Sequence, residues 1–164
     1  MRPFHVTFVC TGNICRSPMG EVILRRLLEE EGLGDAVSVD SAGTTEWEVG
    51  NPMDRRAVKE LRRHDYDGTA HIARQFDRGW FGHTDLLLAA DKGHQQALRR
   101  LAPTSEDAEK VHLMREFDPA AVAAGTLEVD DPWYGDDEDF VRCFAEVEAS
   151  CRGVVPFIRE RITP

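Results

Sequence analysis

An unbroken apolar segment near the middle of the chain constrains its fold most strongly. Residues 85–90 read Asp-Leu-Leu-Leu-Ala-Ala, with no polar residue after the first position. Such runs are typical of strands that are buried on both faces, and these strands occur in parallel sheets covered by helices. The segment therefore predicts an α/β fold with this strand inside its sheet.

The rest of the chain alternates between strand-like and helix-like segments. Strands are expected at 4–9, 37–40 and 110–114, in addition to 85–90. Helices are expected from Ser17-Pro18 to the glycines Gly32 and Gly34, and at 54–64, 91–101 and 137–162. This alternation predicts one right-handed parallel sheet with helices on both faces. Ligands of such sheets bind beyond the carboxyl ends of the strands, where the loop after the first strand should lie.

Length and charge narrow the class of protein further. The 164 residues fit one domain, expected to span 1–164, and their net charge of −10 disfavours nucleic acid or an anionic membrane as a partner. The apolar run within residues 1–9 is too short for a secretory signal, and no other stretch is long enough to span a bilayer. We expect a cytoplasmic monomer, with export without a signal left open.

The four cysteines divide into two pairs with different prospects. Cys143 and Cys151 lie in the expected terminal helix, about 12 Å apart at 1.5 Å per residue, so they cannot form a disulfide with each other. We expect both to be buried structural thiols. Cys10 and Cys15 instead border a polar loop between the first strand and the first helix.

That loop, Cys10-Thr11-Gly12-Asn13-Ile14-Cys15-Arg16-Ser17, carries the features of an anion site. Gly12 and Asn13 tolerate positive φ, so successive backbone N–H groups can turn towards one point. The following helix directs its positive end at the same place, and Arg16 can hold two phosphate oxygens at once. The same positive field would favour the thiolate form of Cys10 and make it a nucleophile. The alternative is a small buried thiol at a strand end.

The segment Cys10–Pro18 resembles the signature of the low-molecular-weight protein tyrosine phosphatases, particularly those of actinobacterial type. Three further segments resemble the family in the same order: Asp40-Ser41-Ala42-Gly43-Thr44 with Trp47, residues 70–75, and Asp131-Pro132-Trp133-Tyr134-Gly135. The resemblance implies a four-stranded parallel sheet flanked by helices. It also implies that the chain hydrolyses phosphotyrosine in proteins, and small aryl phosphates, through a cysteinyl-phosphate intermediate.

The resemblance also implies roles for individual residues. The catalytic residues would be Cys10 as nucleophile, Arg16 as ligand of the transferring phosphoryl group, and Asp131 as general acid and base. Substrate binding is implied for Thr11, Gly12, Asn13, Ile14, Cys15, Trp47, Trp133 and Tyr134, the aromatic residues favouring a flat phenyl ring. The supporting residues would be Ser17, which donates to the sulfur of Cys10, together with Ser41 and His71. Cys15 would also act in redox protection, by forming a reversible disulfide with Cys10.

Several alternatives remain at this stage. Ser17 could be a plain helix cap, Cys15 a buried small residue, and Asp118, in the other Asp-Pro pair, the general acid. An arsenate reductase would share the Cys10–Arg16 spacing but needs further redox cysteines, and a phosphotyrosine-binding module would lack a working acid. No His, Asp or Glu cluster has the spacing of metal ligands along the sequence, so we expect neither a metal nor a cofactor.

Overall fold

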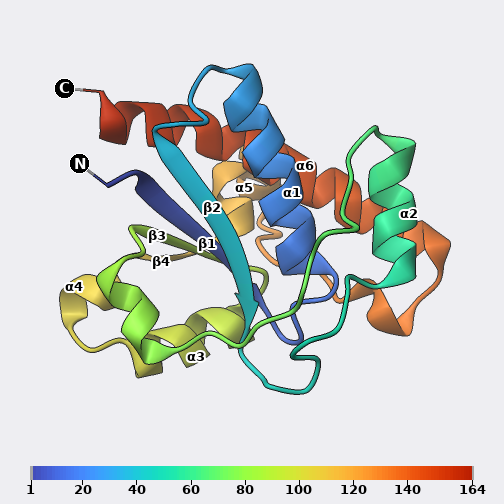
Figure 1. Cartoon of the computed structure of the whole chain (residues 1–164), viewed down its shortest axis with the longest axis horizontal. Coiled ribbons are helices and arrows are strands. Elements are labelled where there is room, and N and C mark those ends of the chain that lie inside the picture. The colour runs from blue at the N-terminus through green and yellow to red at the C-terminus, as the bar shows by residue number, and fades with distance from the viewer. Residues whose placement is uncertain (1, 164) are drawn as a thin grey trace.

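The computed structural model describes residues 2–163, so Met1 and Pro164 of the expected domain lie outside the described residues. Four parallel strands form one sheet in the order β2-β1-β3-β4 (Figure 1). Their bounds are β1 Phe4–Cys10, β2 Val37–Gly43, β3 Leu86–Ala89 and β4 Val111–Leu113. The expected parallel sheet is confirmed, and the apolar run at 86–89 lies inside it, with a strand on either side.

Helices connect the strands and extend to the end of the chain. The helices expected from the sequence are α1 Arg16–Glu30, α2 Arg55–Arg63, α3 Lys92–Leu101 and α6 Asp137–Ile162. The sequence did not predict α4 Ser105–Ala108 and α5 Pro119–Ala124, nor the 3₁₀ turns η1 Arg78–Gly82, η2 Met114–Phe117 and η3 Pro132–Tyr134. These elements are too short to show the apolar periodicity of an amphipathic helix.

Side chains of the expected type define several helix ends. Asp54, Asp91 and Asp136 each accept a hydrogen bond from a backbone N–H in the first turn of α2, α3 and α6. After α1 the chain passes through Gly32, whose φ of 74° is the left-handed conformation that glycine adopts readily. The first helix begins one residue before the expected Ser17, with Cys15 at its N-cap position.

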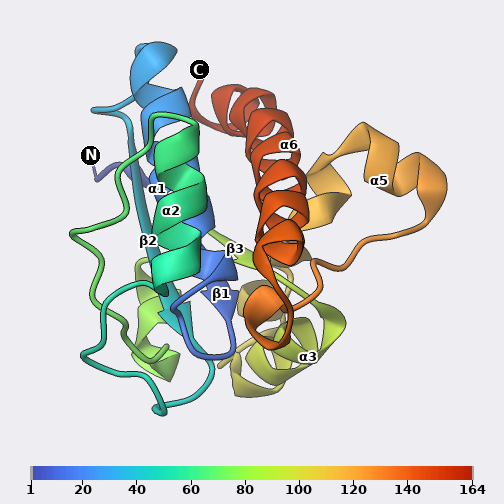
Figure 2. The same ribbon diagram turned by 90° about the vertical axis from the view of Figure 1, so that its right-hand side faces the viewer.

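The two faces of the sheet are covered by different helices. Val6 and Phe8 of β1 point into a core shared with α1 and α6, whereas Val9 packs with Phe81 and with Leu98 of α3 (Figure 1). Figure 2 shows α6 running alongside α1 and α2. The expected covering of both faces is therefore confirmed.

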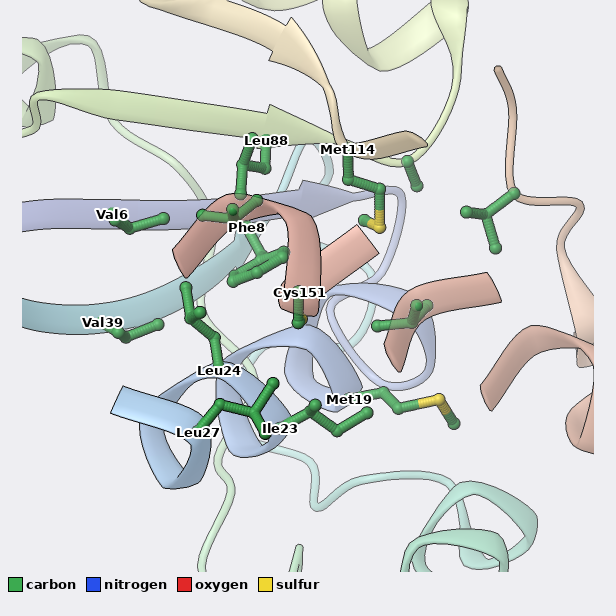
Figure 3. Close-up of a cluster of buried hydrophobic side chains, with 14 of the residues drawn as sticks. Val6, Phe8, Met19, Ile23, Leu24, Leu27, Val39, Leu88, Met114 and Cys151 are labelled. Atoms are coloured by element: carbon green, nitrogen blue, oxygen red, sulfur yellow. The ribbon is translucent and has the colours of Figure 1, made fainter. Parts of the chain in front are cut away.

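The larger core depends on one close approach between strand and helix. Phe8 of β1 points towards α1 and lies in one core cluster with Ile23 and Leu24 of that helix (Figure 3). A Cβ atom built on Gly20 would lie 2.5 Å from the Phe8 ring, so only glycine lets α1 approach this strand so closely. This contact sets the position of α1, and therefore of the loop that precedes it. Among residues 2–163, no helix combines the length and the apolarity needed to cross a membrane.

Candidate active site

The loop between β1 and α1 borders a cavity of about 140 Å³ at the carboxyl end of the sheet. In Figure 1 this is the blue loop that follows the end of β1. The loop contributes Cys10, Thr11, Gly12, Ile14, Cys15 and Arg16 to the lining. The other lining residues come from two distant segments: Trp47, Glu48, Asp131, Trp133 and Tyr134. The structure thus gathers ten of the predicted catalytic and substrate-binding residues around one opening.

Cys10 is the last residue of β1, and its sulfur contacts two atoms of Ser17. The Sγ atom lies 2.9 Å from Ser17 Oγ and 3.4 Å from the Ser17 backbone nitrogen, whose N–H donates to it. Because Ser17 Oγ accepts a hydrogen bond from Asn13 Nδ2 at 2.8 Å, its own hydrogen is free to point at the sulfur. Two donors, the Ser17 hydroxyl and the Ser17 backbone N–H, can therefore point at the sulfur. Ser17 is not the cap of α1, since Cys15 occupies that position.

Asn13 holds the loop from behind, and it is the one predicted substrate-binding residue that is absent from the cavity lining. Its side chain is fully buried and its φ is 60°, the left-handed conformation predicted for it. Its Nδ2 donates to Ser17 and Ser41, and its Oδ1 accepts from the Arg74 backbone N–H at 2.9 Å. The asparagine therefore links the loop to β2 and to the segment that contains Arg74.

The Asn13 carbonyl has a partner in His71. His71 Nε2 lies 2.6 Å from this oxygen, which can only accept, so Nε2 carries the hydrogen. Burial lowers the pKa of His71, which keeps its ring neutral at neutral pH. Ser41, the other predicted supporting residue, accepts from Asn13 and donates to Glu21 Oε1 at 2.7 Å. Both residues touch Asn13 and are absent from the cavity lining.

Gly12 differs from the sequence expectation in its conformation. Gly12 is not among the residues with positive φ. Within the loop, Asn13 alone has the positive φ that was expected to turn the backbone N–H groups inward. A Cβ atom on Gly12 would instead lie 3.1 Å from Glu48 Cγ. The glycine therefore provides space for the neighbouring segment at the edge of the cavity.

Arg16 is almost fully buried, and one side of its guanidinium is already engaged. Nη1 donates to Asp91 Oδ2 at 2.9 Å and to the Val129 carbonyl at 2.8 Å, which uses both of its hydrogens. Nη2 and Nε remain to grip two oxygens of an anion. Burial alone would lower the pKa of Arg16, but the charges of Cys10, Asp131 and Asp91 raise it, so the side chain stays cationic.

Asp91 and His94 are residues that the sequence analysis missed. His94 Nε2 lies 2.7 Å from Thr11 Oγ1, and His94 Nδ1 lies 3.1 Å from Asp91 Oδ1. The two residues thus connect Arg16 with Thr11 on the other side of the loop. Asp91 lies just after the carboxyl end of the buried strand, where the site residues of parallel sheets gather. This position in the sequence could have identified Asp91 as a site residue.

Asp131 is the carboxylate beside the cavity. Its Oδ2 lies 3.6 Å from Arg16 Nη2, and its Oδ1 accepts from the Trp133 backbone N–H at 3.1 Å. Its side chain is 34% exposed, so it is accessible to a substrate in the cavity. The alternative acid, Asp118, caps α5 through the Ala120 N–H and is not part of the cavity lining. The geometry favours Asp131.

Aromatic side chains surround the entrance of the cavity. Trp47 is 75% exposed and Tyr134 is 83% exposed, while Trp133 packs edge-on against Tyr134 with ring centroids 4.9 Å apart. Such exposed rings offer an apolar surface on which a planar group can stack. Glu48 adds a negative charge to the same lining.

The remaining thiols are all buried and free. Burial and the charge of Asp54 raise the pKa of Cys15, so this thiol is protonated at neutral pH. Burial also raises the pKa of Cys143 and of Cys151. The structural role expected for these last two agrees with their places in the core.

Comparison with known proteins identifies the family. The model of the family described as low molecular weight phosphotyrosine protein phosphatase matches residues 5–162. The chain belongs to this family. A low molecular weight protein-tyrosine-phosphatase of Streptomyces coelicolor is 50% identical over 159 residues, which cover 97% of this chain and 96% of the relative. This confirms both the resemblance inferred from the four segments and the expected enzyme class.

Two further comparisons extend the match to other organisms. The low molecular weight protein-tyrosine phosphatase A of Mycobacterium tuberculosis is 46% identical over 160 residues, covering 98% of this phosphatase and 94% of the relative. A crystal structure of a protein tyrosine phosphatase from Entamoeba histolytica superposes with a TM-score of 0.90 at 28% identity. That alignment covers 98% of this chain and 99% of the other.

Proposed function

We propose that this phosphatase hydrolyses phosphotyrosine in proteins, and small aryl phosphates, through a cysteinyl-phosphate intermediate. The Cys10 sulfur attacks phosphorus in line, forming a sulfur–phosphorus bond as the bond from phosphorus to the tyrosine oxygen breaks. Asp131 protonates the departing phenolate. Water then attacks phosphorus with Asp131 as general base, which releases inorganic phosphate and restores the thiolate. The observation that carries the proposal is the meeting of Cys10, Arg16 and Asp131 at one cavity.

The charges around the cavity support this sequence of steps. The N-terminus of α1 and the backbone N–H groups of the loop favour negative charge on sulfur and on the phosphoryl oxygens. Arg16 has two N–H directions free after binding Asp91 and Val129, which matches two equatorial oxygens of the transferring group. Donation from Ser17 to sulfur lowers the cost of expelling the thiolate in the second step.

The cavity lining supports an aromatic phosphate monoester as the substrate class. Trp47, Trp133 and Tyr134 can stack on the phenyl ring while the phosphate reaches the loop. A serine side chain is shorter than a tyrosine side chain, so we expect phosphoserine to reach Cys10 less well. Glu48 at the same edge would repel acidic residues that flank the phosphotyrosine. We infer a preference for substrates without acidic residues at those flanking positions.

Replacing the nucleophile separates binding from turnover. Cys10→Ser should bind inorganic phosphate or vanadate while its kcat on an aryl phosphate falls below detection, because the hydroxyl is a poor nucleophile at neutral pH. Rapid mixing of the unsubstituted enzyme should show a burst of phenol equal to the enzyme concentration if hydrolysis of the intermediate is the slower step.

Cys151→Ala is the matched control, because it removes another buried thiol away from the cavity. It should retain both the binding and the turnover below its unfolding temperature. Full turnover by Cys10→Ser would assign the nucleophile to another residue. Loss of anion binding in that variant would show that Cys10 has a mainly structural role.

A further inference from the structure

Three side chains from distant segments converge on the face of the sheet opposite α1. His5 lies near the start of β1, Asp40 lies on β2, and His83 follows η1. Their ligand atoms all lie within 4.8 Å of one another. The cluster is separate from the active site, since His5 precedes Cys10 by five residues along the same strand, about 17 Å. The spacing of the three residues along the sequence gave no sign of it.

The position of Ser38 allows His5 to adopt the tautomer of a metal ligand. Its Nδ1 lies 2.6 Å from Ser38 Oγ, which can accept the ring hydrogen and leave the lone pair on Nε2. Histidines that bind metals commonly donate their other ring N–H to an oxygen in this way. Nε2 is buried and, among the described residues, has no partner with the geometry of a hydrogen bond. The distance from Nε2 to Asp40 Oδ1 is nevertheless only 3.0 Å.

This short but misaligned contact suggests two groups that face a common point. Ligands of a tetrahedral zinc ion, each about 2.0–2.1 Å from the metal, lie about 3.3 Å from one another. The separation between His5 and Asp40 is close to that value. The ring centroids of His5 and His83 are 5.5 Å apart in an edge-on arrangement, and a ring nitrogen of each lies within 4.8 Å of the other and of a carboxylate oxygen of Asp40.

Asp40 is prepared to act as an anionic ligand. A neighbouring hydroxyl group and a neighbouring guanidinium orient its carboxylate. Thr7 Oγ1 donates to Oδ1 at 2.7 Å, and Arg74 Nη2 lies 3.6 Å from Oδ2. The arginine competes for the carboxylate charge, but it approaches Oδ2, whereas His5 lies beside Oδ1.

We propose that His5, Asp40 and His83 bind a divalent transition-metal cation of the Zn²⁺ class. Two imidazoles and one carboxylate favour zinc, cobalt or nickel over the oxygen-seeking magnesium and calcium. His83 is exposed, so the metal can enter from solvent and keep a water molecule as a fourth ligand. The bound ion would join the segment before β3 to β1 and β2. That segment also contacts the phosphate loop, through the Arg74 N–H and Asn13.

Calorimetric titration of the full chain with Zn²⁺ tests the site, and the visible absorption of Co²⁺ reports its ligand geometry. The titrations use the Cys10→Ser chain, so that the active-site sulfur cannot act as a ligand. We expect one metal per chain, with His83→Ala and Asp40→Asn each raising Kd at least about tenfold. His83→Ala removes an exposed side chain, and therefore its effect is not attributable to unfolding.

His112→Ala is the matched control. His112 also pairs with a carboxylate, Glu116 at 3.0 Å, but it is not part of the three-residue cluster. It should leave Kd unchanged. Absence of stoichiometric binding, or equal Kd values for His83→Ala and His112→Ala, would overturn the proposal. In the chain with Cys10 intact, EDTA should leave kcat/KM unchanged, because the proposed catalytic steps use no metal; activity restored only by added metal would contradict this separation.

Discussion

At the scale of single residues, the charge of the buried arginine is the central feature of the site. Arg16 is fixed by Asp91 and by the Val129 carbonyl, so its guanidinium does not have to be ordered when a substrate arrives. This preorganisation is worth most in a site where the donors already point at the developing charge. Asp131 lies beside the same guanidinium, with its Oδ2 3.6 Å from Arg16 Nη2.

Replacing Asp131 should show a dependence on the leaving group. Asp131→Asn removes the proton donor, so kcat/KM should fall about 10²–10³-fold for phenols that leave poorly and much less for those that leave well. Steady-state kinetics on a series of aryl phosphates measure this slope. Asp118→Asn, at the cap of α5, should leave the slope unchanged. If both groups of substrates lose activity equally in Asp131→Asn, the acid is a different residue.

Mild oxidation should produce a disulfide between Cys10 and Cys15. As the proposed nucleophile, Cys10 should be the thiol that peroxide oxidises first to a sulfenic acid. The protonated Cys15 on the same loop then condenses with the sulfenic acid, releasing water. Mass spectrometry should detect the linked peptides, and a thiol reductant should restore turnover. Cys15→Ala should recover poorly after the same treatment. Equal recovery would remove the protective role of Cys15.

At the scale of elements, the end of β2 supports the phosphate loop from behind. Gly43 pairs in register with Cys10, and the backbone N–H groups of Thr44 and Thr45 donate to the Cys10 and Thr11 carbonyls. A Cβ atom on Gly43 would lie 2.6 Å from the Thr11 carbonyl oxygen. The loop therefore rests directly on a strand position that has no side chain.

Gly43→Ala should displace the loop and impair both folding and catalysis. We expect a loss of about 1–3 kcal/mol in the free energy of unfolding from overpacking. The loss in kcat/KM should reach about 10–100-fold, because a shift near 1 Å misplaces the reacting groups. Denaturant unfolding and steady-state kinetics measure the two effects. Gly82→Ala is the control and should change neither quantity, because an added Cβ there meets no atom within 4 Å. Unaltered kinetics in Gly43→Ala would show that the loop accommodates the added methyl group without misplacing the reacting groups.

The strands, the long helices and the Cys10–Arg16 loop could be predicted because each depends on neighbours in the sequence. The inward turn of Asn13 was predicted from its tolerance of positive φ, whereas its buried side chain was not, because its partners Ser41 and Arg74 come from distant segments. The contact of Arg16 with the Val129 carbonyl could not be predicted, since a backbone oxygen leaves no mark in the sequence.

At the scale of the whole molecule, one buried histidine beside the active site also affects the stability of the fold. His94 is 5% exposed and connects Asp91 with Thr11. Burial lowers its pKa to about 4, with the charge of Asp91 opposing and that of Arg16 adding to this shift. Protonation of His94 is therefore disfavoured in the folded chain but not in the unfolded chain, where the pKa is about 6.5.

This difference predicts a loss of stability in mild acid. Between pH 6.5 and about 4 the unfolded chain binds a proton that the folded chain does not, so the free energy of unfolding falls as the pH falls. At pH 5 the loss from this one group is about 2 kcal/mol relative to pH 7.5. Urea titrations at both pH values should show His94→Asn losing about 2 kcal/mol less than the unsubstituted chain. The same loss in both proteins would mean that His94 is already protonated in the folded state, and another group would have to account for the acid sensitivity.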